Sequence, residues 1–161
     1  MIERYTLPAM GAIWSEENKL RNWLKIEIAA CEGWARLGKI PAEAAKVIQT
    51  KADFDIEGVR AIEAEVRHDV IAFLTNMGEY VGEESKYIHL GMTSSDILDT
   101  GLAMQMRDSA DIILTKLEKL QNIIAGLARK YKYTLCIGRT HGVHGEPTTF
   151  EIGRASCRER V

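Results

Sequence analysis

The sequence lacks the features that mark several large classes of protein. Only three of its 161 residues are cysteine, and they stand far apart without the paired spacing of a zinc site. We therefore expect no disulfide framework, and we expect the protein to work in a reducing compartment. No apolar run approaches the roughly 18 residues that cross a bilayer, and the first residues lack the basic-then-apolar order of a signal peptide. We expect a cytoplasmic protein that does not enter a membrane.

A surplus of charge of one sign is also missing. The chain has 21 lysines and arginines against 23 acidic residues, a net charge of −2, with no block of like charge. This balance favours neither nucleic acid nor an anionic membrane surface as a partner. A chain of this length with 46% hydrophobic residues can bury one modest core, so one domain, or one and part of another, is expected.

Proline is scarce, with three residues, and no run alternates polar and apolar residues for more than a few positions, so the expected fold class is all-α. Ser15 is a good cap for a helix from about Glu16 to about Leu37. Pro41 suits the start of a helix over residues 42–49. Asp55 and Asp69 are each placed to cap a further helix.

A long proline-free stretch from Ser95 to about Lys130 predicts a helix of roughly 50 Å. Its apolar residues recur at steps of four and three, which indicates packing along its length in a bundle. This apolar seam consists of Met106, Ala110, Ile113, Leu117, Leu120, Ile124 and Leu127. Nothing else in the chain is long enough to cover it, so we expect other subunits or further sequence to do so. The predicted division is an N-terminal helical domain over residues 1–94 and the start of a central helical bundle over 95–150.

The last eleven residues, 151–161, differ in texture from the rest. Three arginines fall within the final eight positions, and no helical apolar face is present. Read codon for codon, the segment also matches a common sequencing adapter. Our hypothesis is that it does not belong to the native protein, and a native basic tail is the alternative.

All four histidines lie in three short polar islands, residues 67–69, 89–96 and 138–144. Histidine is the side chain most easily poised for proton transfer near neutral pH, and each copy here has Arg, Asp, Thr or Ser nearby. The pattern favours an acid/base catalyst. For the first island, Arg67, His68 and Asp69, a surface ion cluster is the alternative.

The second island stands where the long helix begins. Thr93 and Ser94 offer hydroxyls beside free backbone N–H groups at a positive helix end, which suits a carboxylate or phosphate. His89, four residues upstream of Thr93, can donate to the same anion. Plain helix capping by the hydroxyls is the alternative.

The third island belongs to a stretch, residues 138–147, with three glycines and a proline, so a loop or tight turn is expected. His141 has a hydroxyl neighbour and open backbone around it, which suits a proton donor; a surface histidine without a role is the alternative. His141, His144 and Glu146 could supply metal ligands, but their spacing is not that of a helical zinc site, so no metal is expected.

Taken together, these motifs resemble the N-terminal part of the adenylosuccinate lyase family, from Met1 to about Phe150. The resemblance rests on Arg4-Tyr5, on residues 67–70, on 89–96 followed by Asp99-Thr100, and on 138–144 followed by 146–148. The broader superfamily, with argininosuccinate lyase, fumarase and aspartase, shares the Thr/Ser island and an all-α, homotetrameric fold. The occurrence of both the third island and residues 67–69 in one chain points to the adenylosuccinate branch.

The resemblance implies β-elimination of fumarate from adenylosuccinate, and from succinylaminoimidazole carboxamide ribotide, in purine nucleotide synthesis, with no cofactor. His141 matches the general acid, while Thr93 and Ser94 match residues that hold the succinyl carboxylates. His89 matches an active-site histidine placed near the phosphate. The positions that match nucleotide-binding residues are Arg4, Tyr5, Arg67, His68 and Asp69.

Two departures from the family accompany the resemblance. Gly145 stands where alanine is expected, which loosens the backbone after the acid. The chain also ends before the loop that supplies the family's catalytic serine, and family active sites combine three subunits. We therefore expect the 161 residues to be inactive alone. Another fumarate-releasing lyase of the superfamily and a non-catalytic helical scaffold are the alternative functions.

Overall fold

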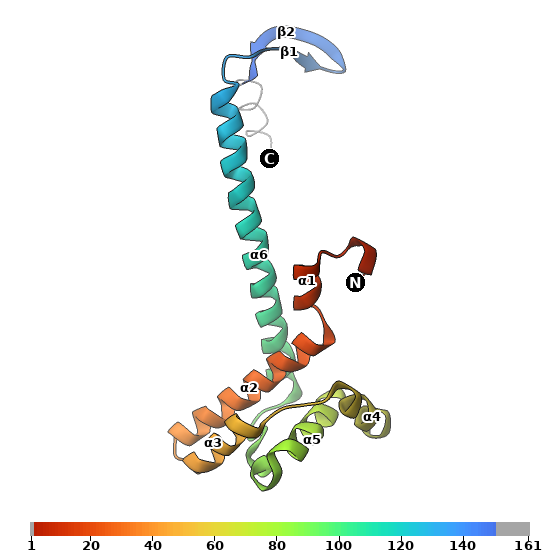
Figure 1. Cartoon of the computed structure of the whole chain (residues 1–161), viewed down its shortest axis with the longest axis vertical. Helices are drawn as coiled ribbons and strands as arrows, with labels where there is room; N and C mark the ends of the chain where they lie inside the picture. The colour runs from red at the N-terminus through yellow and green to blue at the C-terminus, as the bar shows by residue number, and fades with distance from the viewer. Residues whose placement is uncertain (1, 151–161) are drawn as a thin grey trace. The chain divides into compact units, whose positions relative to one another are not determined.

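The computed structural model describes residues 2–150, which form six α-helices, two short 3-10 helices and one hairpin (Figure 1). The predicted all-α fold class is confirmed. Two compact units divide the chain, with the border between Ala110 and Asp111. The elements are η1 Glu3–Tyr5, α1 Pro8–Ile13, α2 Glu16–Arg36, α3 Ala42–Lys51, α4 Ile56–Val66, α5 Asp69–Val81, η2 Gly82–Tyr87, α6 Ser94–Lys130, β1 Leu135–Thr140 and β2 Val143–Thr149.

The domain division at residues 94 and 95 stays a prediction, and the hypothesis about residues 151–161 lies outside the described residues. Within residues 2–150, no helix combines the length and the apolar character needed to cross a membrane.

Local capping explains where the helices of the first unit begin. The Ser15 hydroxyl accepts a hydrogen bond from the Asn18 N–H at 3.1 Å, and α2 starts at the next residue, as predicted. The Asp55 carboxylate accepts from the Gly58 N–H at 2.6 Å at the start of α4. Each side chain satisfies one of the N–H groups that a helix leaves unpaired in its first turn.

The predicted cap of α5 is wrong by one residue. His68, not Asp69, occupies the capping position, and its ring Nδ1 accepts from the Ile71 N–H at a long 3.4 Å. Asp69 is the first helical residue and accepts from the Val70 N–H at 2.8 Å. A carboxylate is also favourable within the first turn because of the helix dipole, so sequence alone does not separate the two positions.

The core of the first unit is built around Trp23. Its ring meets the edge of Phe73 on α5 at 5.6 Å between centroids, and Phe73 in turn meets Phe54 at 5.8 Å. Gly101 lets α6 approach the same tryptophan, because a Cβ there would lie 3.0 Å from Trp23 Cδ1. Ile97 on α6 is also fully buried. The beginning of α6 is therefore fixed against α2 by close packing.

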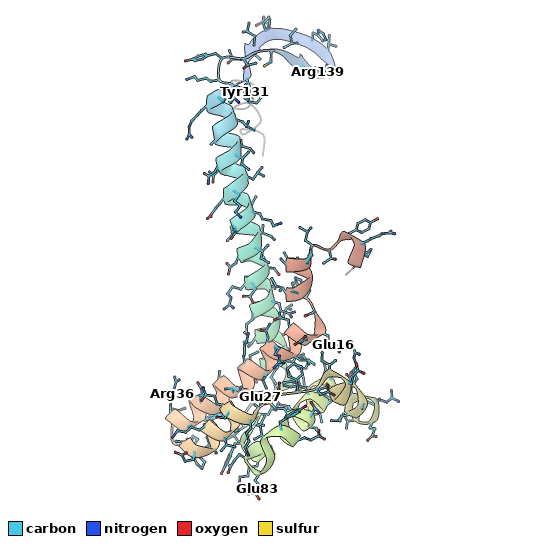
Figure 2. All side chains as sticks on the ribbon, in the orientation of Figure 1. Glu16, Glu27, Arg36, Glu83, Tyr131 and Arg139 are labelled. Atoms are coloured by element: carbon cyan, nitrogen blue, oxygen red, sulfur yellow. The ribbon has the colours of Figure 1, made fainter. Side chains whose placement is uncertain are left out.

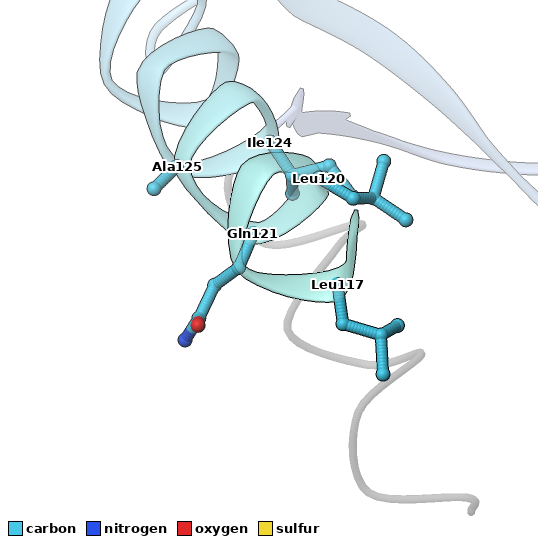
Figure 3. A pocket seen from close by; sticks show the side chains of 5 residues that line it. All are labelled: Leu117, Leu120, Gln121, Ile124 and Ala125. Atoms are coloured by element: carbon cyan, nitrogen blue, oxygen red, sulfur yellow. The ribbon is translucent and has the colours of Figure 1, made fainter. Parts of the chain in front are cut away.

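The apolar seam from Met106 to Leu127 lies on α6, so we call it the α6 seam, and it is uncovered within residues 2–150. Its large side chains are between 36% and 58% exposed. In the second unit, Leu117, Leu120 and Ile124 line one surface pocket of this helix together with Gln121 and Ala125 (Figure 3). An apolar row of this length is typical of a surface that another helix covers.

The predicted loop over residues 138–147 is a β-hairpin with a tight turn. Thr140 pairs with Val143, so the turn holds only His141 and Gly142, with φ of 51° and 76°. Two successive positive φ values define the type I′ turn that suits the twist of paired strands. The turn was predicted correctly and the strands were not, because the strand residues are mostly exposed and show no alternation of polar and apolar character.

Candidate functional site

Each of the three polar islands contains one residue in the left-handed backbone region. Arg67 has φ 57°, His89 has 63° and His141 has 51°, and no other non-glycine residue within the described range has positive φ. This conformation is uncommon for residues with a Cβ, and it persists where the surroundings impose it, often at functional sites. The backbone thus singles out the same three places as the histidine pattern.

His89 is held by a buried acid on α2. Its ring Nδ1 lies 2.7 Å from Glu27 Oε1, and its backbone N–H donates to Glu27 Oε2 at 2.9 Å. The Glu27 side chain is 0% exposed, and the His89 side chain is 21% exposed. Figure 2 labels Glu27 midway along α2. Both bonds go to one residue, so the position and the ring orientation of His89 are fixed together.

Two further side chains on α2 hold the same segment, residues 87–92, which we call the His89 turn. The Cys31 thiol lies 3.5 Å from the Tyr87 carbonyl oxygen, and Trp34 Nε1 donates to the Leu90 carbonyl at 2.8 Å. Burial, with the Glu27 charge as the smaller cause, raises the pKa of the Cys31 thiol from 9.0 to about 11. The thiol therefore stays protonated near neutral pH.

The start of α6 is capped by Asp96 and not by the predicted hydroxyls. The Asp96 carboxylate accepts from the Thr93 N–H at 2.7 Å, which is one half of a capping box. Within residues 2–150, the Thr93 and Ser94 hydroxyls make no hydrogen bond, and Thr93 is exposed. These two hydroxyls therefore do not cap the helix, and both can hydrogen-bond to a ligand.

The first island lies at the junction of α4 and α5. His68 and Asp69 are about half exposed, at 47% and 45% for their side chains. The His68 Nδ1 accepts from the Ile71 N–H, so it cannot also donate to Asp69, whose nearest oxygen is 3.6 Å away. Arg67 makes no ion pair in the described part of the chain, and it lines a shallow pocket with Arg60 and Glu63. Within the described residues, the surface ion-cluster alternative retains the 3.6 Å contact between His68 and Asp69, in which Arg67 takes no part.

Arg4 and Tyr5 lie in η1 near the beginning of the chain. Both are exposed, and the Arg4 guanidinium carbon lies 4.8 Å from the centroid of the Tyr5 ring. The guanidinium and the ring stack on each other, and neither residue bonds to residues 67–69 or 89–96 in the described part of the first unit.

His141 belongs to the second unit and lies at the tip of the hairpin, with an exposed side chain. No side-chain hydrogen bond to it occurs among the described residues. No group of three or more His, Cys, Asp or Glu side chains is arranged to hold a metal ion in the same part of the chain.

Within the described part of the first unit, no hydrogen bond or ion pair links the first island, residues 67–69, to the second, residues 89–96. Helix α5, of 13 residues, begins at the first island and ends before the His89 turn; at 1.5 Å per residue it is about 20 Å long. In the chain, helix α5 and η2 therefore stand between the two islands of the first unit.

Glu27 is the functional candidate that the sequence interpretation missed. A signal was present: the buried face of α2 carries Leu20, Trp23, Leu24 and Cys31, and Glu27 stands on that stripe at steps of three and four. An acid on the apolar stripe of a helix is rarely buried without a partner. That partner, His89, is 62 residues away in sequence.

Comparison with known proteins supports the same family. A family model described as "Lyase" matches residues 3–154. The adenylosuccinate lyase of Synechocystis sp. is 59% identical over 150 residues, which are 93% of this chain and 35% of the relative. The adenylosuccinate lyase of Bacillus subtilis is 48% identical over 161 residues, 100% of this chain and 37% of the relative.

Solved structures show the same fold. A fumarate lyase from Mesorhizobium sp. superposes with a TM-score of 0.85 at 31% identity, covering 91% of this chain and 36% of that one. The resemblance predicted from the motifs is confirmed. The chain spans little more than a third of the length of the curated relatives it matches.

Proposed function

The chain belongs to this Lyase family, and we propose from that premise that residues 1–150 are part of a longer adenylosuccinate lyase. The reaction is β-elimination of fumarate from adenylosuccinate, giving AMP, and from succinylaminoimidazole carboxamide ribotide, giving AICAR. The observation that carries the proposal is the coincidence of the three left-handed residues, Arg67, His89 and His141, with the three islands that resemble the family.

The elimination needs three kinds of group. A base removes a carbon-bound proton next to a carboxylate, an acid protonates the departing nitrogen, and fixed donors stabilise the negative charge between these steps. His141 is the proposed acid, because an exposed ring at a tight turn can approach a ligand. The proposed base is a serine in a loop outside these 161 residues.

The succinyl carboxylates are proposed to bind at the start of α6. The Thr93 and Ser94 hydroxyls make no hydrogen bond there within residues 2–150, and Thr93 is exposed. The first turn of a 37-residue helix adds its positive end, which stabilises an anion. The nucleotide is proposed to bind to Arg4, Tyr5, Arg67, His68 and Asp69, together with His89.

Two features support a site shared between subunits. No bond joins residues 67–69 to residues 89–96 in the described part of the first unit, and the large side chains of the α6 seam are 36–58% exposed. We propose that copies of the longer protein pack along this seam as a homotetramer and bring islands from different copies together. The 161 residues alone should then release no fumarate.

The decisive test is a His141→Asn variant of the longer protein. Asparagine followed by glycine is the preferred pair of a type I′ turn, so the hairpin geometry is retained while the imidazole is lost. We expect kcat/KM for adenylosuccinate to fall at least about 100-fold, measured by fumarate absorbance. The matched control is His144→Asn, three residues away on β2 and without an assigned role, which should keep its activity.

Other outcomes separate the rival functions. Turnover of argininosuccinate or aspartate, but not of adenylosuccinate, would identify another lyase of the superfamily. A His141→Asn variant with unchanged activity would remove the general acid from the proposal. A longer protein that assembles normally and turns over none of these substrates would be a scaffold.

A further inference from the structure

Glu27 is a fully buried carboxylate whose hydrogen-bond donors, within residues 2–150, both come from His89. Oε2 accepts the backbone N–H of His89 at 2.9 Å, and Oε1 lies 2.7 Å from the ring Nδ1. Burying a carboxylate is costly, and replacing a buried ionic group by an apolar one is often neutral or stabilising. Packing alone therefore does not explain an acid at this position.

The surroundings of Glu27 make the arrangement rigid. Glu27, Cys31 and Trp34 stand at positions i, i+4 and i+7 of α2, so they share one face of the helix. They contact His89, Tyr87 and Leu90 respectively. Three neighbouring residues of the turn are thus tied to one helix face, which maintains the left-handed φ of 63° at His89.

The hydrogen-bond pattern determines which ring nitrogen can meet a ligand. A carboxylate only accepts, so the hydrogen of a neutral His89 ring must be on Nδ1. Nε2 points to the other side of the ring and has no partner within the described residues. His68 shows the opposite arrangement, because its Nδ1 accepts from the Ile71 N–H and its hydrogen must then be on Nε2.

We propose that Glu27 is a positioning residue of the nucleotide site: it fixes the hydrogen of His89 on Nδ1 and presents Nε2 to the substrate. This inference rests on the proposed function for its ligand, but the Glu27–His89 arrangement itself does not. Glu27 contacts no substrate and acts through His89.

The first experiment measures the His89 tautomer in the 161-residue chain. With 15N-labelled histidine rings, at a pH where the rings are neutral, we expect the hydrogen of His89 on Nδ1 and that of His68 on Nε2. A His89→Asn variant assigns the signal. An Nε2–H tautomer at His89 in the unaltered chain overturns the proposal, whatever happens to any variant.

Glu27→Gln should reverse the tautomer. The amide oxygen of glutamine can accept the His89 backbone N–H, and its NH2 group must then donate to Nδ1, which moves the ring hydrogen to Nε2. Glu32→Gln is the matched control on the same helix, because Glu32 contacts Gln49 and Arg36 and not His89. An unchanged His89 tautomer in folded Glu27→Gln, or an equal change in both variants, contradicts the inference.

The second experiment is a double-mutant cycle in the longer protein. If Glu27 acts only through His89, Glu27→Gln should raise KM for adenylosuccinate about tenfold, and His89→Gln should do so by a similar factor. The double variant should lose no more than the larger single loss, because the two residues act as a unit. Multiplying losses would show that Glu27 has only a general structural role. A longer protein without lyase activity would refute the proposed function, while the tautomer experiment would still decide the role of Glu27.

Discussion

His89 and His141 occupy the same kind of backbone position in very different surroundings. Both have positive φ, 63° and 51°, and both belong to a tight turn. The His89 ring is bonded to a carboxylate that is 0% exposed, whereas the His141 turn lies in a hairpin whose strand residues are mostly exposed. One histidine is oriented by a side chain of its own chain, and the other is placed by backbone geometry alone.

This difference indicates how the two residues obtain their working geometry. The His89 turn is tied to α2, whose Trp23 and Leu20 are only 2% exposed, so its orientation depends on the core of the first unit. The hairpin around His141 has no buried residue within the described range. We expect its ring to be oriented only when other elements of the longer protein pack against it.

Removing the core beneath the His89 turn is the strongest way to break the comparison. Trp23→Ala empties a site that contacts Phe73 and Gly101, and large-to-small core changes of this kind cost about 3 to 5 kcal/mol. We expect a lower urea midpoint of unfolding and loss of the signal for the Nδ1–H tautomer of His89. Leu120→Ala, at a side chain that is 51% exposed, should change the free energy of unfolding by less than about 0.5 kcal/mol. Equal effects of the two changes would contradict the assigned core.

The pH dependence of stability tests the buried surroundings of Cys31, which holds the His89 turn. The pKa of the Cys31 thiol is raised from 9.0 to about 11, mainly by burial. An unfolded chain releases this proton near pH 9 while the folded chain retains it, so folding binds a proton in that window and stability falls as pH rises from about 9 to about 11. The full effect is about 3 kcal/mol.

The measurement is the difference in free energy of unfolding between the unaltered chain and Cys31→Ala across that pH range. Other titrating groups cancel in the difference. Cys136 lies in β1 and is only partly buried, so Cys136→Ala is the matched control for the loss of a thiol. A difference that stays flat between pH 9 and 11 would rule out a buried, protonated Cys31.

Much of the fold follows from short-range signals in the sequence. Ser15 and Asp55 predict helix starts because their caps involve residues three positions away. The contacts that define the candidate site are long-range. Glu27 and His89 are 62 residues apart, so the pattern on α2 shows that an acid is buried and does not show what it binds. The hairpin strands were missed for a related reason, since backbone pairing without a buried face leaves no periodicity.

The smallest expected effect concerns the hairpin turn itself. Gly142→Ala places a Cβ at φ 76°, where side chains are rarely tolerated, and should destabilise the hairpin by about 1 kcal/mol. Gly126→Ala is the same substitution inside α6 with open space around it, and it should stabilise the helix by up to about 1 kcal/mol. Amide hydrogen exchange measures both. The turn assignment would be contradicted if Gly126→Ala made the hairpin amides exchange faster. It would also be contradicted if Gly142→Ala left their exchange rates unchanged.

The left-handed residues have a consequence for protein engineering. Arg67, His89 and His141 each hold a conformation that glycine or asparagine adopts at lower cost. A search for thermostable variants that scores folding alone will therefore favour exchanges at these three positions. On the proposed function, such exchanges would trade turnover for heat resistance, so a library built for both properties should keep these codons constant.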